Sequence, residues 1–175
     1  MSIHYLLERR KGIANRRAIV GPRDEYYWGF EDAYNKGAWI LHTLRNVLDD
    51  DAIFFGILSG FQKEFAEQIV CTEDLVEYIN EVTGKDFYAF FNQYIFDRRP
   101  PVLEYNITDN KLFYRYNGIV DGFTMPINVL VNKEEIRLRP TTATQELDIP
   151  DYATVQIMDW EYLIIKKENR ILKLN

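Results

Sequence analysis

The feature that most constrains the fold of this chain is a change of hydrophobic period at Asp97-Arg98-Arg99-Pro100-Pro101. Before the two prolines, apolar residues recur at the three- and four-residue spacing of helices that bury one face. After them, apolar and polar residues alternate, as in strands that bury one side. We therefore predict an α+β chain, with an N-terminal α-helical bundle over residues 1–99 and a small antiparallel β-sandwich over residues 100–175.

The first half contains four predicted helices, and the one that begins near Tyr34 and reaches Leu48 is apolar on so many sides that we expect it at the centre of the bundle. The next helix follows Asp49 or Asp50 as its N-cap and has an apolar stripe that extends to Phe65. A third is predicted to start at a Thr72 cap and to stop at Gly84, and a fourth contains Phe87, Phe90, Phe91, Tyr94 and Ile95.

The second half is predicted to form short strands separated by turn signals such as Asn117-Gly118. These strands are expected at residues 102–108, 111–116, 124–131, 134–139, 145–149, 154–158 and 162–166. Pro126 within the third segment predicts an edge strand or a bulge, because proline cannot donate to the ladder. No Gly/Ser-rich linker separates the halves, so we expect them to pack directly on each other.

Composition and charge exclude several classes of protein. Apolar residues make up 47% and aromatic residues 15% of the 175 residues, which indicates packed cores rather than disorder. The formal net charge of −6 does not favour nucleic-acid binding, and the basic run from Arg9 to Arg23 is interpreted as a solvated loop or a surface segment. Cys71 is the only cysteine, no apolar stretch is long enough to span a bilayer, and no signal peptide is recognisable, so the compartment is not indicated.

One segment of the predicted central helix suggests a function. Tyr34-Asn35-Lys36-Gly37-Ala38-Trp39, with Leu41-His42 and Leu44-Arg45, resembles the Tyr-x-Lys-Gly-Ala element of the aminopeptidase N family of zinc metallopeptidases, the gluzincins. The helix start at residues 71–75, the junction at residues 83–87, the aromatic segment at residues 90–94 and the strands opening at Pro101 follow the order of that family. The resemblance covers nearly all 175 residues. It implies that residues 1–99 are the helical C-terminal part of a metallopeptidase catalytic domain and that residues 100–175 are the β-sandwich domain that follows.

The resemblance implies a catalytic role for Tyr34. A phenol stays protonated at neutral pH and can donate a hydrogen bond to the oxyanion of a tetrahedral intermediate, and losing one such donor costs about 2.7–4 kcal/mol of barrier. The alternative is that Tyr34 is an aromatic residue that fills space at a helix start. Gly37 would let another helix or a substrate approach the backbone, or would serve tight helix packing alone.

The sequence lacks the residues that would bind a catalytic metal. A catalytic zinc needs three protein ligands, whereas the two histidines, His4 and His42, do not form the HExxH pattern of the family. His42 lies between apolar residues and is interpreted as a core histidine with its hydrogen bonds satisfied. We therefore expect no metal or cofactor site in this chain, and the resemblance implies zinc and a peptide substrate only in a full-length parent.

Two functional hypotheses remain open from the sequence. The first is an enzyme fragment, inactive alone, that contributes Tyr34 to peptide-bond hydrolysis in the parent. The second is a non-catalytic helix-plus-sandwich module that mediates protein interactions. Under the first hypothesis, helices separated from the zinc-bearing part would expose apolar surface, and the isolated chain would self-associate or have a sticky surface near Tyr34.

Overall fold

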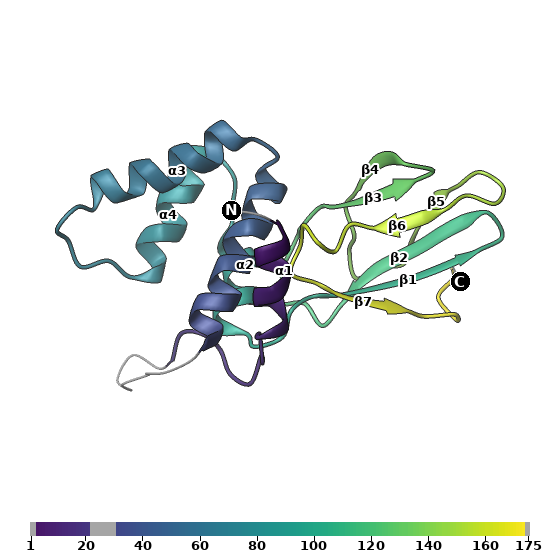
Figure 1. Cartoon of the computed structure of the whole chain (residues 1–175), viewed down its shortest axis with the longest axis horizontal. Helices are drawn as coiled ribbons and strands as arrows, with labels where there is room; N and C mark the ends of the chain where they lie inside the picture. The colour runs from purple at the N-terminus through teal and green to yellow at the C-terminus, as the bar shows by residue number, and fades with distance from the viewer. Residues whose placement is uncertain (1–2, 22–30, 174–175) are drawn as a thin grey trace.

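In the computed structural model, which describes residues 3–21 and 31–173, the helices come first and the strands follow, so the predicted α+β class is confirmed (Figure 1). The helices are α1 (Ile3–Lys11), α2 (Glu31–Leu48), α3 (Asp51–Glu64), α4 (Thr72–Thr83) and α5 (Tyr88–Phe91), and a π-helical turn (Asn92–Phe96) continues α5. The strands are β1 (Val102–Thr108), β2 (Lys111–Asn117), β3 (Ile127–Val131), β4 (Glu134–Leu138), β5 (Gln145–Asp148), β6 (Val155–Ile157) and β7 (Ile165–Glu168).

The ends of the helices are set by local hydrogen bonds. Asp50 is the N-cap of α3, and its side chain accepts a hydrogen bond from the Ile53 N–H at 3.0 Å. Gly84 ends α4 in the left-handed conformation with φ 64°, as predicted. The predicted Thr72 cap is wrong, because Thr72 is already helical and Cys71 occupies the cap position. The carboxylate of Asp74 accepts the Cys71 N–H at 2.7 Å, so the cap is stabilised from inside the helix.

The strands form two sheets, with the order β5-β2-β1-β7 in one and β4-β3-β6 in the other. The predicted sandwich contains one parallel pair, because β7 runs parallel to β1 with Val102 opposite Ile165. The prediction that Pro126 marks an edge strand or a bulge is wrong. β3 begins only at Ile127 and is the central strand of its sheet, so Pro126 precedes the strand and no ladder N–H is lost.

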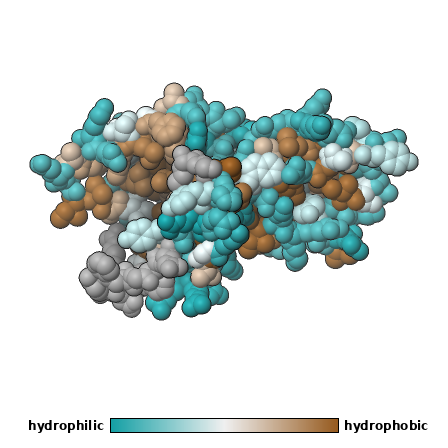
Figure 2. All heavy atoms as spheres, viewed as in Figure 1, coloured by the Kyte–Doolittle hydropathy of each residue, from teal (hydrophilic) through white to brown (hydrophobic). Residues whose placement is uncertain are grey.

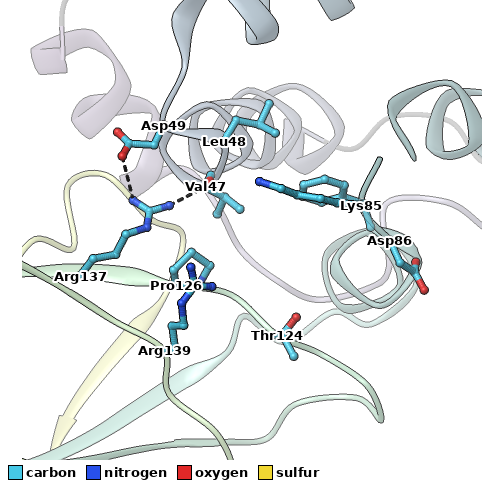
Figure 3. A pocket seen from close by; sticks show the side chains of 10 residues that line it. Val47, Leu48, Asp49, Lys85, Asp86, Thr124, Pro126, Arg137 and Arg139 are labelled. Carbon is cyan, nitrogen blue, oxygen red and sulfur yellow. Dashed lines mark hydrogen bonds and ion pairs between the residues drawn. The ribbon is translucent and has the colours of Figure 1, made fainter. Parts of the chain in front are cut away.

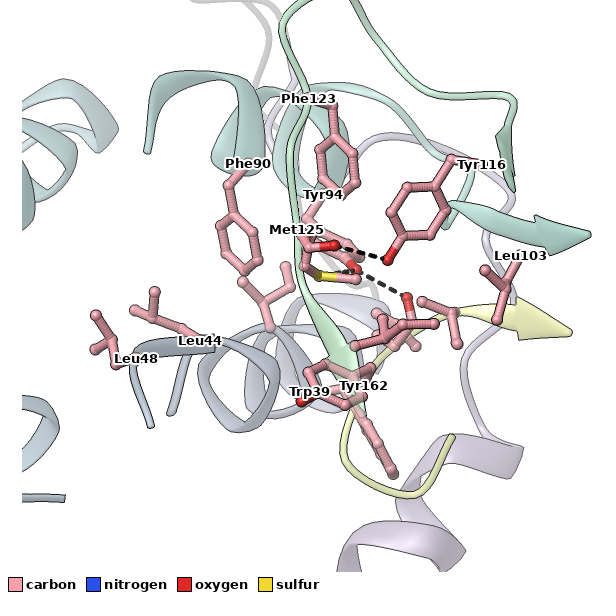
Figure 4. Packing of buried hydrophobic residues seen from close by; sticks show 14 of the residues in the cluster. Trp39, Leu44, Leu48, Phe90, Tyr94, Leu103, Tyr116, Phe123, Met125 and Tyr162 are labelled. Carbon is pink, nitrogen blue, oxygen red and sulfur yellow. Dashed lines mark hydrogen bonds between the residues drawn. The ribbon is translucent and has the colours of Figure 1, made fainter. Parts of the chain in front are cut away.

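The buried residues of the helices and of the sheets form one continuous hydrophobic cluster (Figure 4). Tyr94, from the π-helical turn, is fully buried and packs edge-on against Phe123 at a ring-centroid distance of 6.2 Å. Its hydroxyl donates to the Leu163 carbonyl oxygen at 3.0 Å. Trp39, at the centre of α2, is also fully buried, and its indole N–H donates to the Leu6 carbonyl oxygen at 2.8 Å. The two halves therefore pack directly on each other, as the sequence predicted.

Main-chain atoms of residues 159–164 bind successive side chains of the helical part. Thr43 Oγ1 accepts from the Leu163 N–H at 2.8 Å, and Asn46 Nδ2 donates to the Glu161 carbonyl oxygen at 2.9 Å. Arg10 donates to the carbonyl oxygens of Asp159 and Ile164. A segment that immediately precedes β7 therefore completes the helical half.

The basic N-terminal run is only partly a solvated surface. Residues Ile3–Lys11 form α1, and the guanidinium of Arg10 lies over the Trp39 ring, 4.9 Å from its centroid. Arg10 is therefore a packed residue, whereas Arg9 and Lys11 are side chains of the outer helix surface. Arg23 lies outside the described residues. Among the helices that the structure describes, none combines the length and the apolar character needed to cross a membrane.

Candidate functional site

The first turns of α2 carry the Tyr34-Asn35-Lys36-Gly37 segment. The Tyr34 side chain is 80% exposed, and no hydrogen bond to its hydroxyl is found within residues 3–21 and 31–173. Its neighbours are the opposite: Asp32 and Asn35 are each 6% exposed, and Lys36 is fully buried. In this segment, therefore, the phenol of Tyr34 is exposed to solvent while the neighbouring polar side chains are buried.

Lys36 faces away from Tyr34, because residues two positions apart in a helix lie on nearly opposite sides. Its ammonium donates to the carbonyl oxygens of Asp97 at 3.2 Å and Arg98 at 3.1 Å, in the link between the helices and the sandwich. Burial lowers the pKa of Lys36 from 10.5 to about 8, although the carboxylates of Asp32 and Asp97 act in the opposite direction. Lys36 thus connects α2 to the start of the sandwich.

Asp32 and Asn35 tie the same turn to two other segments. The Asp32 carboxylate accepts from the Ala14 N–H at 2.7 Å and from the Asn15 N–H at 2.8 Å. Arg9 of α1 donates to Asn35 Oδ1 at 3.1 Å. Sequence reasoning missed these anchors, because Asp, Asn and Lys in a helix are usually surface residues. The one signal in the sequence was the position of Asn35 and Lys36 inside the motif.

The side of α2 that carries Tyr34 leads into an apolar groove. Ala38, Leu41 and Arg45 recur on the same helical stripe as Tyr34, since they lie four, seven and eleven positions after it. These residues line one wall of a groove of about 400 Å³ between α1, α2 and α3, whose full lining is Ile3, Leu6, Ala38, Leu41, His42, Arg45, Phe54, Phe55 and Leu58. Figure 2 shows further apolar residues exposed over the α3 and α4 end of the molecule.

Gly37 lies beside this open stripe. No atom within 4 Å would meet a Cβ added at Gly37, so the predicted close approach of another helix is not realised among the described residues. Tight packing of another helix on this glycine is therefore not found among residues 3–21 and 31–173. Gly37 lies four positions before Leu41, which lines the groove, so the two residues share one side of α2.

A larger cavity, of about 710 Å³, lies at the other end of α2 (Figure 3). Arg137 of β4 reaches into it and donates to the carbonyl oxygens of Val47 at 2.7 Å and Asn46 at 3.2 Å, which caps the last turn of α2. Its guanidinium also lies 3.7 Å from the Asp49 carboxylate. Tyr34 is separated from this cavity by about 20 Å of helix, at 1.5 Å per residue, so the two places are distinct.

Neither histidine is placed to bind a metal with partners from the described residues. His42 Nε2 lies 3.0 Å from the Trp160 carbonyl oxygen, and the ring packs edge-on against Trp39 at 5.3 Å. Burial lowers the pKa of His42 and favours its neutral form. Within the described ranges, no group of three His, Cys, Asp or Glu side chains could hold a metal ion. Residues 3–21 and 31–173 therefore do not by themselves supply the ligand set of a catalytic zinc.

The chain is similar in sequence and in fold to parts of known aminopeptidases. No family model matches the chain. The chain is 25% identical over 174 residues to the Aminopeptidase N of Lactococcus lactis subsp. lactis, an alignment that covers 94% of this chain and 19% of that protein. Its fold is similar to that of Legionella pneumophila aminopeptidase A, crystallised in complex with aspartic acid, with a TM-score of 0.62 and 16% identity over 95% of this chain and 23% of that one.

These similarities confirm the resemblance that the sequence suggested, which extends over nearly all of this chain. The chain spans about a fifth of the length of the curated relative and just under a quarter of the solved structure. It is therefore similar to one part of an aminopeptidase.

Proposed function

We propose that this chain is a C-terminal fragment of an aminopeptidase-like zinc metallopeptidase, in which Tyr34 stabilises the oxyanion formed during peptide-bond hydrolysis. The observation that supports this most directly is the contrast within one helical turn, where a phenol that is 80% exposed stands above the fully buried Lys36. An aromatic residue that merely filled space would be expected to bury its ring. The extent of the similarity to Aminopeptidase N, 94% of this chain, supports the same assignment.

The chemistry assigned to Tyr34 is a hydrogen bond donated in the transition state. As the scissile carbonyl becomes tetrahedral, its oxygen gains negative charge, and a phenol O–H aimed at that position stabilises it more than it stabilises the substrate. The hydroxyl of Tyr34 has no competing partner among the described residues, so it is free to make this bond. Interactions that strengthen only in the transition state raise kcat rather than lower KM.

In this proposal, the residues that bind the metal belong to the remainder of the parent protein. Residues 1–99 would form the helical end of the catalytic domain and residues 100–175 the following sandwich domain. The zinc, which would polarise the substrate, would be held by residues outside this chain. The chain alone is accordingly proposed to be inactive, and its substrate, a peptide, would bind only in the full-length protein.

The open apolar groove along α2 supports the fragment hypothesis. Phe55 of α3 and Ile3 of α1, which line the groove, are 53% and 43% exposed. Clusters of exposed apolar residues mark contact surfaces. Because similar proteins are about four to five times longer than this chain, we propose that the rest of the parent covers this face, and that in the isolated chain a second copy does so.

The decisive experiment is Tyr34→Phe in the full-length protein that contains this chain, assayed with an aminoacyl-4-nitroanilide. We expect kcat to fall by about a hundred- to a thousandfold with KM changed by less than about threefold. The matched control is Tyr152→Phe, which changes a tyrosine that is fully exposed on the turn before β6 and is expected to leave kcat unchanged. An unchanged kcat in Tyr34→Phe would remove Tyr34 from the mechanism and favour the interaction module.

A further inference from the structure

We propose that Lys36 and Asp32 are positioning residues, which hold the first turn of α2 so that the hydroxyl of Tyr34 occupies one fixed place. This inference rests on the proposed function, since it gives a role to the two buried side chains in the helical turn that carries the proposed catalytic phenol. It starts from an unusual placement: two residues with ionisable side chains, separated by one helical turn, are both buried at the start of one helix. Lys and Asp are among the residues least often fully buried.

The first step of the argument is that each anchor binds main-chain atoms of a segment distant in sequence. Lys36 donates to the carbonyl oxygens of Asp97 and Arg98, which lie 61 and 62 residues further along the chain. Asp32 accepts from the backbone N–H groups of Ala14 and Asn15, on the preceding side. The turn is thus held from two directions, and a rotation of α2 about its axis would break bonds on both sides.

The second step is that the partners of Lys36 are themselves fixed. The Asp97 carboxylate accepts from the Arg99 N–H at 2.9 Å and forms an ion pair with the Arg99 guanidinium at 2.7 Å, which closes a tight local loop. Gln93, fully buried in the π-helical turn, donates to the Arg99 carbonyl oxygen at 2.8 Å. Pro100 and Pro101 follow and restrict the backbone further. The ammonium of Lys36 therefore donates its hydrogen bonds to a segment whose backbone is itself held in place.

The third step is the direction in which these contacts leave Tyr34. Lys36 points towards the link to the sandwich, and a residue two positions earlier points to the opposite side, along the stripe that leads into the groove. An exposed side chain makes few contacts that could fix its own position. Its placement must then come from the backbone beneath it, and a displacement of about 1 Å at a catalytic group can cost a hundredfold in rate.

The test is a double-mutant cycle in the full-length protein, with Lys36→Met and Asp32→Asn each made in the wild type and in Tyr34→Phe. Both changes keep the size of the side chain while weakening its bonds. In the wild type we expect each to lower kcat by about tenfold with KM nearly unchanged, and in Tyr34→Phe by less than about twofold. Two variants are used so that one still decides the matter if the other does not fold.

The control for a purely structural effect is Thr43→Val, which removes the bond to the Leu163 N–H on the same helix. It is expected to lower stability without altering kcat in either background. Equal losses from Lys36→Met or Asp32→Asn in both backgrounds would overturn the positioning role and leave Tyr34 in place. Full activity of Tyr34→Phe would overturn the proposed function, and the positioning role with it. A normal kcat in the folded Lys36→Met and Asp32→Asn variants would overturn this inference alone.

Discussion

The lowered pKa of Lys36 predicts how the free energy of unfolding depends on pH. Its pKa is about 8 in the folded chain and 10.5 as an ordinary lysine, so the folded state releases the proton at lower pH than the unfolded state does. Below about pH 8, Lys36 is charged in both the folded and the unfolded state. The full cost of removing its ammonium from water then opposes folding. Between about pH 8 and pH 10.5 the unfolded state binds more protons, so the free energy of unfolding contributed by Lys36 rises with pH.

The size of this effect follows from the same two values. Complete titration from 10.5 to about 8 corresponds to about 3 kcal/mol. Measurement from about pH 7 to pH 9.5 covers only part of that range and solvent screening reduces it, so we expect a rise of about 1–2 kcal/mol. The upper limit of the window is chosen because burial raises the pKa of Tyr94 and of Tyr116, and tyrosine ionisation would destabilise the fold above about pH 10.

The assay is urea denaturation followed by circular dichroism, at several pH values, for the wild type and for Lys36→Met. The variant is expected to lose the upward trend, so the difference between the two curves isolates the contribution of Lys36. Lys63→Met, which changes an exposed lysine near the end of α3, is the matched control and should follow the wild type. Parallel curves for the wild type and Lys36→Met would refute the argument that Lys36 is desolvated in the fold.

Three further predictions concern other parts of the molecule. Although burial alone would raise the pKa of Glu104, hydrogen bonds from Arg115 and neighbouring amides hold it below 4.5, so this carboxylate stabilises the fold above about pH 4.5 and the contribution is lost on acidification. Glu104→Gln should lower the free energy of unfolding by about 1–3 kcal/mol at neutral pH in the same denaturation assay. It should also reduce the loss of stability at acidic pH. Because burial lowers the pKa of His42, stability should also fall as the pH drops below about 6.5, and His42→Gln should show a smaller fall. Phe55→Ser should shift the isolated chain from dimer towards monomer in sedimentation velocity, whereas a monomeric wild type would contradict the proposed self-association.

The strands were predictable because their signals are local. Alternating residues and turn dipeptides located β1 at residues 102–108 and β2 to within one residue of its end. The last strand was misplaced, because Tyr162, Leu163 and Ile164 are all buried against the helices rather than alternating between core and solvent. The strand begins only at Ile165, where exposed residues start. A run of consecutive apolar residues thus marked a buried connection rather than a strand.

The candidate site was predictable only in part. The motif located Tyr34, and its exposure is consistent with a functional residue, but the catalytic role itself stays a prediction. The burial of Asp32 and Lys36 could not be read from the sequence, because the carbonyl and N–H groups that satisfy them belong to residues 97–98 and 14–15. Hydrophobic periodicity describes how a helix packs by apolar faces, and it does not reveal a polar side chain whose partners are main-chain atoms elsewhere.

The bonds between α2 and residues 159–164 have a consequence for the synthesis of this protein. The Thr43 hydroxyl and the Leu163 N–H are separated by 120 residues, so α2 cannot complete its hydrogen bonds until the segment at residues 159–164 has been translated. Until then, Tyr94 lacks the carbonyl oxygen that its buried hydroxyl binds. The helical half should consequently stay incompletely packed until translation has passed position 164.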